Sequence, residues 1–183
     1  MKKLILFFML LVASVSASAQ WYIGGAVGVE RKFDEDFTDF SILPDFGYNF
    51  NDSWALGAQV GFHHTYSEGW KTNLGVISPY ARWTYFRTGN NIVSLFLDGG
   101  FGFEFGSSKY DDGPSSDTTV KYSVGISPGV SFNFTDNFSI EAHMGGLTYE
   151  SGNTAAKVAK VVTPRFGLNF KTTELNLGFV YTF

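Results

Sequence analysis

The feature that most constrains the fold is a two-residue alternation that runs through most of the chain after residue 20. Between Phe40 and Phe50 the even positions carry Phe, Ile, Pro, Phe, Tyr and Phe, whereas the odd positions carry Ser, Leu, Asp, Gly and Asn. Successive side chains of a β-strand point to opposite faces, so this pattern predicts a strand with one apolar face and one small or polar face. Similar alternations begin near Trp21, Trp54, Ser94 and Phe138.

The alternating segments predict a chain made almost entirely of strands. We expect eight, at about residues 21–30, 38–50, 54–66, 72–86, 92–106, 119–134, 138–149 and 174–183. Such a strand content is far above that of an ordinary globular domain. It is typical of a closed barrel, in which every strand has two neighbours.

The apolar face carries nearly all of the large side chains, and their size decides whether this face points into the barrel or out of it. The chain contains 20 Phe, 9 Tyr and 4 Trp, most of them on the apolar face, while the opposite face is rich in Gly, Ser, Asn, Asp and Glu. The interior of an eight-stranded barrel is just wide enough for side chains, so rows of aromatic rings would overfill it. We therefore expect the apolar face to meet lipid, in an all-β, eight-stranded antiparallel up-and-down transmembrane β-barrel. The alternative is a secreted lipocalin-like barrel or sandwich.

The first 19 residues have the pattern of a secretory signal peptide. Lys2 and Lys3 precede ten apolar residues, and Ala17-Ser18-Ala19 supplies the small residues that a signal peptidase reads. We expect cleavage before Gln20, which leaves residues 20–183 as one barrel domain. The formal net charge of −4 and the lack of a basic cluster argue against a nucleic-acid partner. Without cysteine, the chain has no disulfide, no Cys-ligated metal and no thiol nucleophile.

Residues 161–170 raise a question about the last strand. A Pro-x-Phe-Gly-x-Asn-Phe pattern begins at Pro44 and again at Pro164, and related segments begin at Pro79 and Pro128. A separate strand at 161–170 would make nine, whereas a barrel of this kind has an even number. We expect 161–170 and 174–183 to form one long strand with a bulge near residues 171–173. An outer hairpin of residues 158–170 is the alternative. We also interpret the prolines as marks of bulges, because proline cannot donate to a ladder.

Three motifs resemble those of small OmpA/OmpX-like outer-membrane barrels. They are Trp21-Tyr-Ile-Gly-Gly-Ala-Val-Gly, Gly125-Ile-Ser-Pro-Gly-Val and Leu175-Asn-Leu-Gly-Phe-Val-Tyr-Thr-Phe183. The resemblance implies location in the outer membrane, lipid around the wall, and a monomer. It also implies that the barrel-assembly machinery reads the terminal Phe183. The peptidoglycan-binding domain that many such proteins carry is not expected, because the sequence stops at Phe183.

Ionisable residues on the inward parity are the candidate site residues. They are Glu30, Asp45, His63, Arg82, Asp98, Glu104, Lys121, Glu141 and His143. We expect them to pair with one another and to close a narrow lumen, with Arg82 as the only arginine that faces inward on the strands. No cofactor or metal is expected: His63 and His64 point to opposite faces, and Asp111, Asp112 and Asp117 lack the spacing of a calcium site.

These residues leave three classes of function open. The first is a structural or surface-interaction barrel with a polar, ion-paired lumen, which we favour. The second is a narrow pore or small-molecule conduit. The third is a lipid-acting hydrolase built on Ser139, Glu141 and His143, as in lipid A deacylases. A catalytic triad of that kind must face lipid, whereas these side chains share the inward parity. We therefore expect no enzyme activity.

Overall fold

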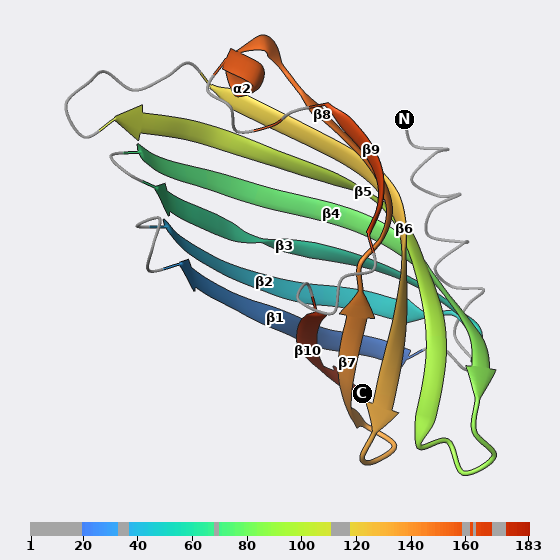
Figure 1. The fold of residues 1–183 in the computed structure, drawn as a ribbon. Coiled ribbons are helices and arrows are strands. Elements are labelled where there is room, and N and C mark those ends of the chain that lie inside the picture. The colour runs from blue at the N-terminus through green and yellow to red at the C-terminus, as the bar shows by residue number, and fades with distance from the viewer. Residues whose placement is uncertain are drawn as a thin grey trace, which may run out of the picture.

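The computed structural model describes residues 20–32, 37–67, 70–110, 118–158, 162, 164–169 and 175–183, so the predicted leader lies outside the described residues. The chain forms an antiparallel barrel (Figure 1). Its strands are β1 (Gln20–Lys32), β2 (Phe37–Asn49), β3 (Trp54–Ser67), β4 (Trp70–Arg87), β5 (Val93–Tyr110), β6 (Thr119–Asn133), β7 (Phe138–Met144), β8 (Gly146–Gly152), β9 (Arg165–Asn169) and β10 (Leu175–Thr182). A short helix, α2 (Thr154–Val158), follows β8.

Eight of these strands close a ring. Each of β1 to β6 pairs with the next strand in the chain, β6 pairs with β7, β7 with β10, and β10 with β1. Every pairing is antiparallel, as expected for strands that run up and down. The predicted eight-stranded antiparallel barrel is therefore confirmed, and the predicted strands agree with the observed ones to within a few residues.

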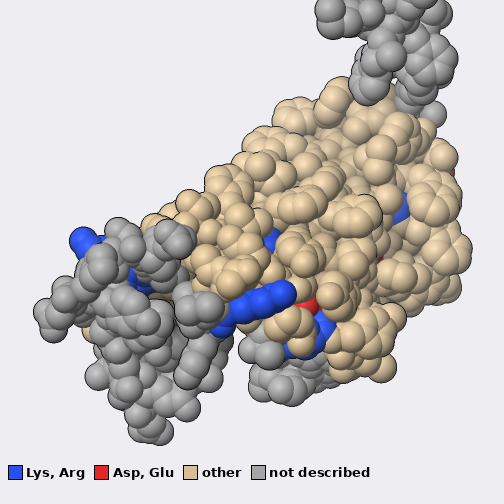
Figure 2. All heavy atoms as spheres, turned by 90° about the horizontal axis from the view of Figure 1, so that it is seen from above, with Lys and Arg blue, Asp and Glu red and all other residues tan. Residues whose placement is uncertain are grey.

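The apolar side chains cover the outside of the wall. Alternate positions of β2 and β3, such as Phe46 and Leu56, are half exposed, whereas their neighbours Asp45 and Ala55 are buried. Figure 2 shows a broad face with few charged side chains. Among the described residues, no helix has the length and apolar character to cross a membrane. Aromatic rings gather where the turns are short, with contacts between Trp21 and Tyr48 and between Trp54 and Trp83.

The two ends of the barrel differ, and we name them by their connections. The turn end carries the short connections at residues 50–53, 88–92 and 134–137, and the C-terminal residue Phe183. The loop end carries α2 and the connections that follow β1, β3 and β5, of which the one between Tyr110 and Thr119 is the longest (Figure 1). The sequence predicts a strand that ends near residue 149. The structure instead continues β8 to Gly152 and then forms α2, whose Ala156 backbone N–H donates to the Asn153 side chain, a contact that supports the start of the helix.

The last two strands of the barrel are each interrupted once. Gly145 separates β7 from β8, and both segments pair with β6, so they form one ascending strand with a bulge. Gly145 has a positive φ of 58°, which favours glycine. β9 pairs with β8 just as β10 pairs with β7, so residues 165–169 extend the last strand and do not form a hairpin on their own. The bulge expected near residues 171–173 lies outside the described residues.

The seam between the first and last strands is short. β1 pairs with β10 from Tyr22 to Ala26, opposite Thr182 to Gly178. In the described part of the chain, the remainder of β1 has β2 as its only partner, and the far edge of β9 has no partner. The ladder between the chain ends is thus formed at the turn end, where Phe183 also donates a backbone hydrogen bond to the Trp21 carbonyl over 2.9 Å.

The interpretation of the prolines as bulges is wrong for two of them. Beside Pro44 and Pro79 the ladder is interrupted on one side, but the register is the same before and after. A proline removes one hydrogen-bond donor without adding a residue to the strand. A gap in the ladder without a shift in register is therefore the expected result. Pro128 differs, because the register of β6 against its partner shifts next to it, at Gly145 and Gly146. Pro164 immediately precedes β9.

Candidate functional site

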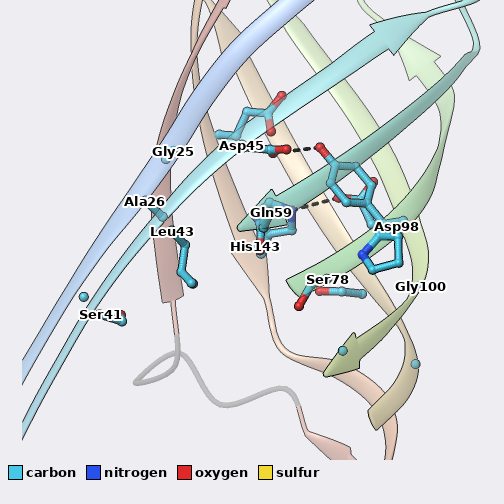
Figure 3. A pocket seen from close by; sticks show the side chains of 18 of the residues that line it. Gly25, Ala26, Ser41, Leu43, Asp45, Gln59, Ser78, Asp98, Gly100 and His143 are labelled. Carbon is cyan, nitrogen blue, oxygen red and sulfur yellow. Dashed lines mark hydrogen bonds and ion pairs between the residues drawn. The ribbon is translucent and has the colours of Figure 1, made fainter. Parts of the chain in front are cut away.

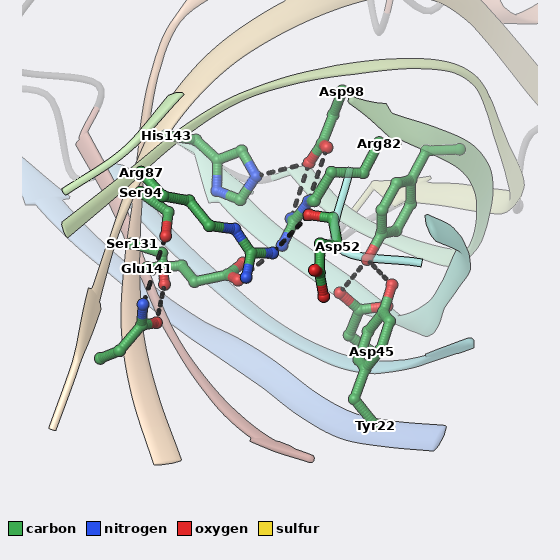
Figure 4. A network of polar contacts seen from close by, with 12 residues as sticks. Tyr22, Asp45, Asp52, Arg82, Arg87, Ser94, Asp98, Ser131, Glu141 and His143 are labelled. Carbon is green, nitrogen blue, oxygen red and sulfur yellow. Dashed lines mark hydrogen bonds and ion pairs between the residues drawn. The ribbon is translucent and has the colours of Figure 1, made fainter. Parts of the chain in front are cut away.

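A buried arginine, Arg82 on β4, lies at the centre of the polar network in the lumen. Its Nε and Nη2 atoms donate to the two carboxylate oxygens of Asp98, each over 2.8 Å, and its Nη1 donates to Glu141 Oε1 over 2.5 Å. The guanidinium carbon lies 3.8 Å from the ring centroid of Phe96, as cation–π packing requires. His143 Nε2 lies 2.9 Å from Asp98 Oδ2 (Figure 4).

The register of the strands explains why these groups meet. Arg82 and Asp98 are directly opposite each other on β4 and β5 and share the inward face. Glu141 and His143 lie two positions apart on β7, so both also point inward. The guanidinium offers a planar fork that matches the Asp98 carboxylate with two parallel hydrogen bonds. The side chains of all three charged partners are largely removed from water, with exposed fractions of 10%, 11% and 8% for Arg82, Asp98 and Glu141.

A chain of hydroxyl groups completes the network toward the first strands. Tyr80 donates from its hydroxyl to Asp45 Oδ2 over 2.7 Å, and the hydroxyls of Tyr22 and Tyr80 lie 2.6 Å apart. Gly47 and Gly57 leave room for these rings, because a Cβ at either position would collide with the Tyr22 side chain. We call the side chains of Tyr22, Asp45, Tyr80, Arg82, Phe96, Asp98, Glu141 and His143 the plug. They reach across the lumen from β1 to β7 (Figure 4).

The plug lies between two cavities. The cavity at the turn end has a volume of about 650 Å³ and is lined by polar residues that include Asn49, Asn91 and Ser131. On the other side of the plug is a cavity of about 290 Å³, which we call the middle chamber. Glu141 contributes to the lining of both.

Small residues line the middle chamber (Figure 3). Asp45, Gln59 and Ser78 follow one another across β2, β3 and β4 in directly paired positions, and all three face the chamber. Gly102 and Ser123 continue this row on β5 and β6, where they are opposite each other. A Cβ at Gly102 would lie within van der Waals distance of both Ser123 Oγ and Ser78 Oγ, so the glycine keeps this part of the lumen open.

A second polar cluster lies toward the loop end. His63 Nε2 is 2.8 Å from Asp39 Oδ2, and His63 Nδ1 is 3.5 Å from Glu104 Oε2. Lys121 Nζ is 2.8 Å from Glu104 Oε1, and the Thr65 hydroxyl donates to Asp39. We call these five side chains the loop-end cluster. Their ion-paired members are 17% to 28% exposed, more than Arg82, Asp98 and Glu141 of the plug.

The structure places eight of the nine predicted site residues in these two groups. Asp45, Arg82, Asp98, Glu141 and His143 belong to the plug, and His63, Glu104 and Lys121 to the loop-end cluster. Glu30 falls on β1 at a position whose side chain lies outside the described part of the structure.

Sequence reasoning missed four residues of the lumen. Tyr22, Tyr80 and Phe96 are apolar enough to be assigned to the wall by composition, but each sits on the inward parity of its strand. Asp39 lies on the inward parity of β2, one residue before the segment in which the alternation was read. In all four cases parity was the available signal: the aromatic rings of Tyr22, Tyr80 and Phe96 obscured it, whereas Asp39 was missed because it precedes that segment.

The expectation that Arg82 is the only inward-facing arginine is wrong. Arg87, at the end of β4, also lines the cavity at the turn end and donates to the Asp52 carbonyl. The register of β4 against β5 shifts between Thr84 and Phe86, so the parity that faces inward changes before Arg87.

The geometry does not assemble a hydrolase from Ser139, Glu141 and His143. Ser139 and His143 are four positions apart on one extended strand, which corresponds to about 13 Å at ~3.3 Å per residue. Glu141 is paired with Arg82, and His143 with Asp98. A nucleophile and its base must lie within hydrogen-bond reach of each other, and Ser139 and His143 do not. Among the described residues, no group of three or more His, Asp or Glu side chains is arranged to hold a metal ion.

Comparisons with known proteins agree with this architecture. The family model described as "Outer membrane protein beta-barrel domain" matches residues 4–183. The N-terminal β-barrel domain of Pseudomonas aeruginosa OprF is similar in structure, with a TM-score of 0.55, 14% identity, and coverage of 91% of this chain and 98% of that one. Neisserial surface protein A gives a TM-score of 0.52, 16% identity, and coverage of 91% and 94%. No curated protein sequence matches this chain.

Proposed function

Because the chain belongs to the outer membrane protein beta-barrel domain family, we propose that it is a structural or surface-interaction protein of the outer membrane whose lumen is closed to solutes. The observation that carries the proposal is the plug. Arg82 is held by two carboxylates and by the ring of Phe96, in the part of the lumen that separates the two cavities. An open path would have to break several charge-assisted hydrogen bonds at once, which is costly in a site largely removed from water.

Conductance in planar lipid bilayers tests whether the lumen is closed. The purified protein should show little current, and Arg82→Ala should raise it, because the substitution removes the group that both carboxylates bind. Arg87→Ala is the matched control: it removes a guanidinium from the same strand, but from the rim of the turn-end cavity. Steady single-channel current from the unmodified protein would favour the alternative function, a narrow pore or small-molecule conduit.

We further propose that the turn end faces the periplasm and the loop end faces the cell exterior. Outer-membrane barrels have short periplasmic turns and longer external loops, and the longest connection between paired barrel strands of this chain, from Tyr110 to Thr119, lies at the loop end together with α2. Cysteine at Lys109, which is exposed at the loop end, should react with a membrane-impermeant maleimide on intact cells. Cysteine at Asp52 should react after the outer membrane is permeabilised. The reverse result would invert the orientation.

Residues 1–19 are proposed to direct export, and Phe183 to act as an assembly signal. The Phe183 side chain is 69% exposed on the outer wall beside Tyr181, and its backbone joins β1 through Trp21. A chain end normally frays, so deletion of one residue should cost little stability. We expect deletion of Phe183 to lower the membrane yield in cells much more than the urea midpoint of protein refolded in micelles. An unchanged membrane yield would contradict the proposed role.

A further inference from the structure

The middle chamber contains a buried carboxylate oxygen without a donor. Asp45 is 5% exposed, and its Oδ2 atom accepts a hydrogen bond from Tyr80. Its Oδ1 atom has no hydrogen-bond partner among the described residues, although Asp45 lines the chamber. An unpaired buried oxygen of a charged group is costly, and most such atoms in proteins have a partner. This atom therefore points to a donor that the described residues do not supply.

Further unpaired polar groups share the chamber with Asp45. Gln59 is directly opposite Asp45 on β3, and Ser78 is directly opposite Gln59 on β4. Neither side chain, nor that of Ser123 on β6, makes a hydrogen bond to another residue in the described part of the chain. The chamber thus presents a carboxylate oxygen, an amide and two hydroxyls to whatever occupies it (Figure 3).

The charges around the chamber favour a cation. The plug places three carboxylates, those of Asp45, Asp98 and Glu141, around one guanidinium and His143. Toward the loop end, Asp39 and Glu104 face Lys121 and His63. The carboxylates outnumber Arg82 and Lys121, so an anion would be repelled and a cation attracted. The volume of about 290 Å³ corresponds to about ten water molecules at ~30 Å³ each, so the chamber holds more than a single bare ion.

We propose that the middle chamber binds a small primary-ammonium compound, whose N–H groups donate to Asp45 Oδ1 and to the side-chain oxygens of Gln59 and Ser78. A primary ammonium carries three donors and one positive charge, as an unpaired carboxylate flanked by neutral acceptors requires. A quaternary ammonium has the charge but no N–H donor, so it would leave Asp45 Oδ1 unpaired. The inference goes beyond the proposed function, because a ligand can occupy the chamber whether or not ions cross the plug.

A titration followed by NMR tests this site with two probes of equal charge. Ethanolamine and choline each carry one positive charge and one hydroxyl, but only ethanolamine has N–H donors. In ¹⁵N-labelled protein in micelles at neutral pH, ethanolamine should saturably shift the Gln59 side-chain amide and the backbone amides of Gly102 and of Gly24, which lies on β1 and is paired with Asp45. Choline should not. Equal shifts with both probes, or linear shifts without saturation, would overturn the proposal.

Variants of the chamber locate the site independently of the probes. Asp45→Asn keeps the shape but removes the charge, and should weaken ethanolamine binding by about tenfold or more, as expected for loss of a charge-assisted hydrogen bond. Asp52→Asn removes a carboxylate at the rim of the turn end and should leave the affinity unchanged. Gln59→Met serves as the second chamber variant if Asp45→Asn does not fold. Wild-type affinity in Asp45→Asn, or in Gln59→Met if it is needed, would refute the assigned site.

Discussion

The plug and the part of the lumen between it and the loop end are filled in different ways. In the plug, rings and a guanidinium pack against each other, and Phe96 is 1% exposed. Toward the loop end, glycine and serine residues leave the middle chamber open, and the ion pairs of the loop-end cluster are partly exposed to solvent. The seam between β1 and β10 is also formed at the turn end. The comparison teaches that the plug is the tightly packed layer of this barrel, while the lumen on either side of it retains space.

The largest expected effect is on the plug. Arg82→Ala removes the shared partner of Asp98 and Glu141, which leaves two carboxylates uncompensated in a site that is about nine-tenths buried. Breaking a buried charge cluster in this way costs about 3–5 kcal/mol. The free energy of unfolding, measured with urea in detergent micelles, should fall by that amount. Arg87→Ala, at the exposed rim, should leave it nearly unchanged. Equal free energies of unfolding for the two variants would show that the ion pairs of Arg82 in the plug do not stabilise the barrel.

A smaller effect is expected at the bulge that joins the two halves of the ascending strand. Gly146 has a φ of 156°, and a Cβ at this position would meet the Ile126 carbonyl and the Ser127 backbone. Gly146→Ala should lower the free energy of unfolding by about 1–3 kcal/mol, the usual cost of a strained backbone conformation. Gly167→Ala is the matched control on β9, because no atom lies within 4 Å of its added Cβ. A loss of stability in the control as large as that in Gly146→Ala would contradict this explanation.

The smallest effect is expected in the loop-end cluster. Lys121 pairs with Glu104 over 2.8 Å, but the two side chains remain 20% and 17% exposed, roughly twice as much as those of Arg82 and Glu141. Pairs that retain contact with water contribute little, about 0–1 kcal/mol. Lys121→Met should therefore change the urea midpoint only slightly, with Lys109→Met as the exposed control. A loss of stability equal to that of Arg82→Ala would show that the loop-end cluster and the plug do not differ in this respect.

Parity predicted the wall and most of the lumen from sequence alone. A side chain on a strand has two possible directions, so alternation assigns each residue to lipid or lumen once the bulky face is known to point outward. The same rule would have placed Tyr22, Tyr80 and Phe96 inside. It failed at Arg87, because a register shift after Thr84 changes the inward parity within a single strand. Such shifts depend on the neighbouring strand and leave no local mark in the sequence.

What the sequence determined by itself was therefore the closed antiparallel barrel, its apolar exterior and the set of charged residues inside it. What only the tertiary structure decided was which of those charges meet. Arg82, Asp98 and Glu141 come from three strands, and their contact depends on the tilt and register of the closed ring. The open chamber likewise depends on glycines of one strand lying opposite serines of another. Pairing between distant segments sets both features, and a periodicity of two residues carries no information about it.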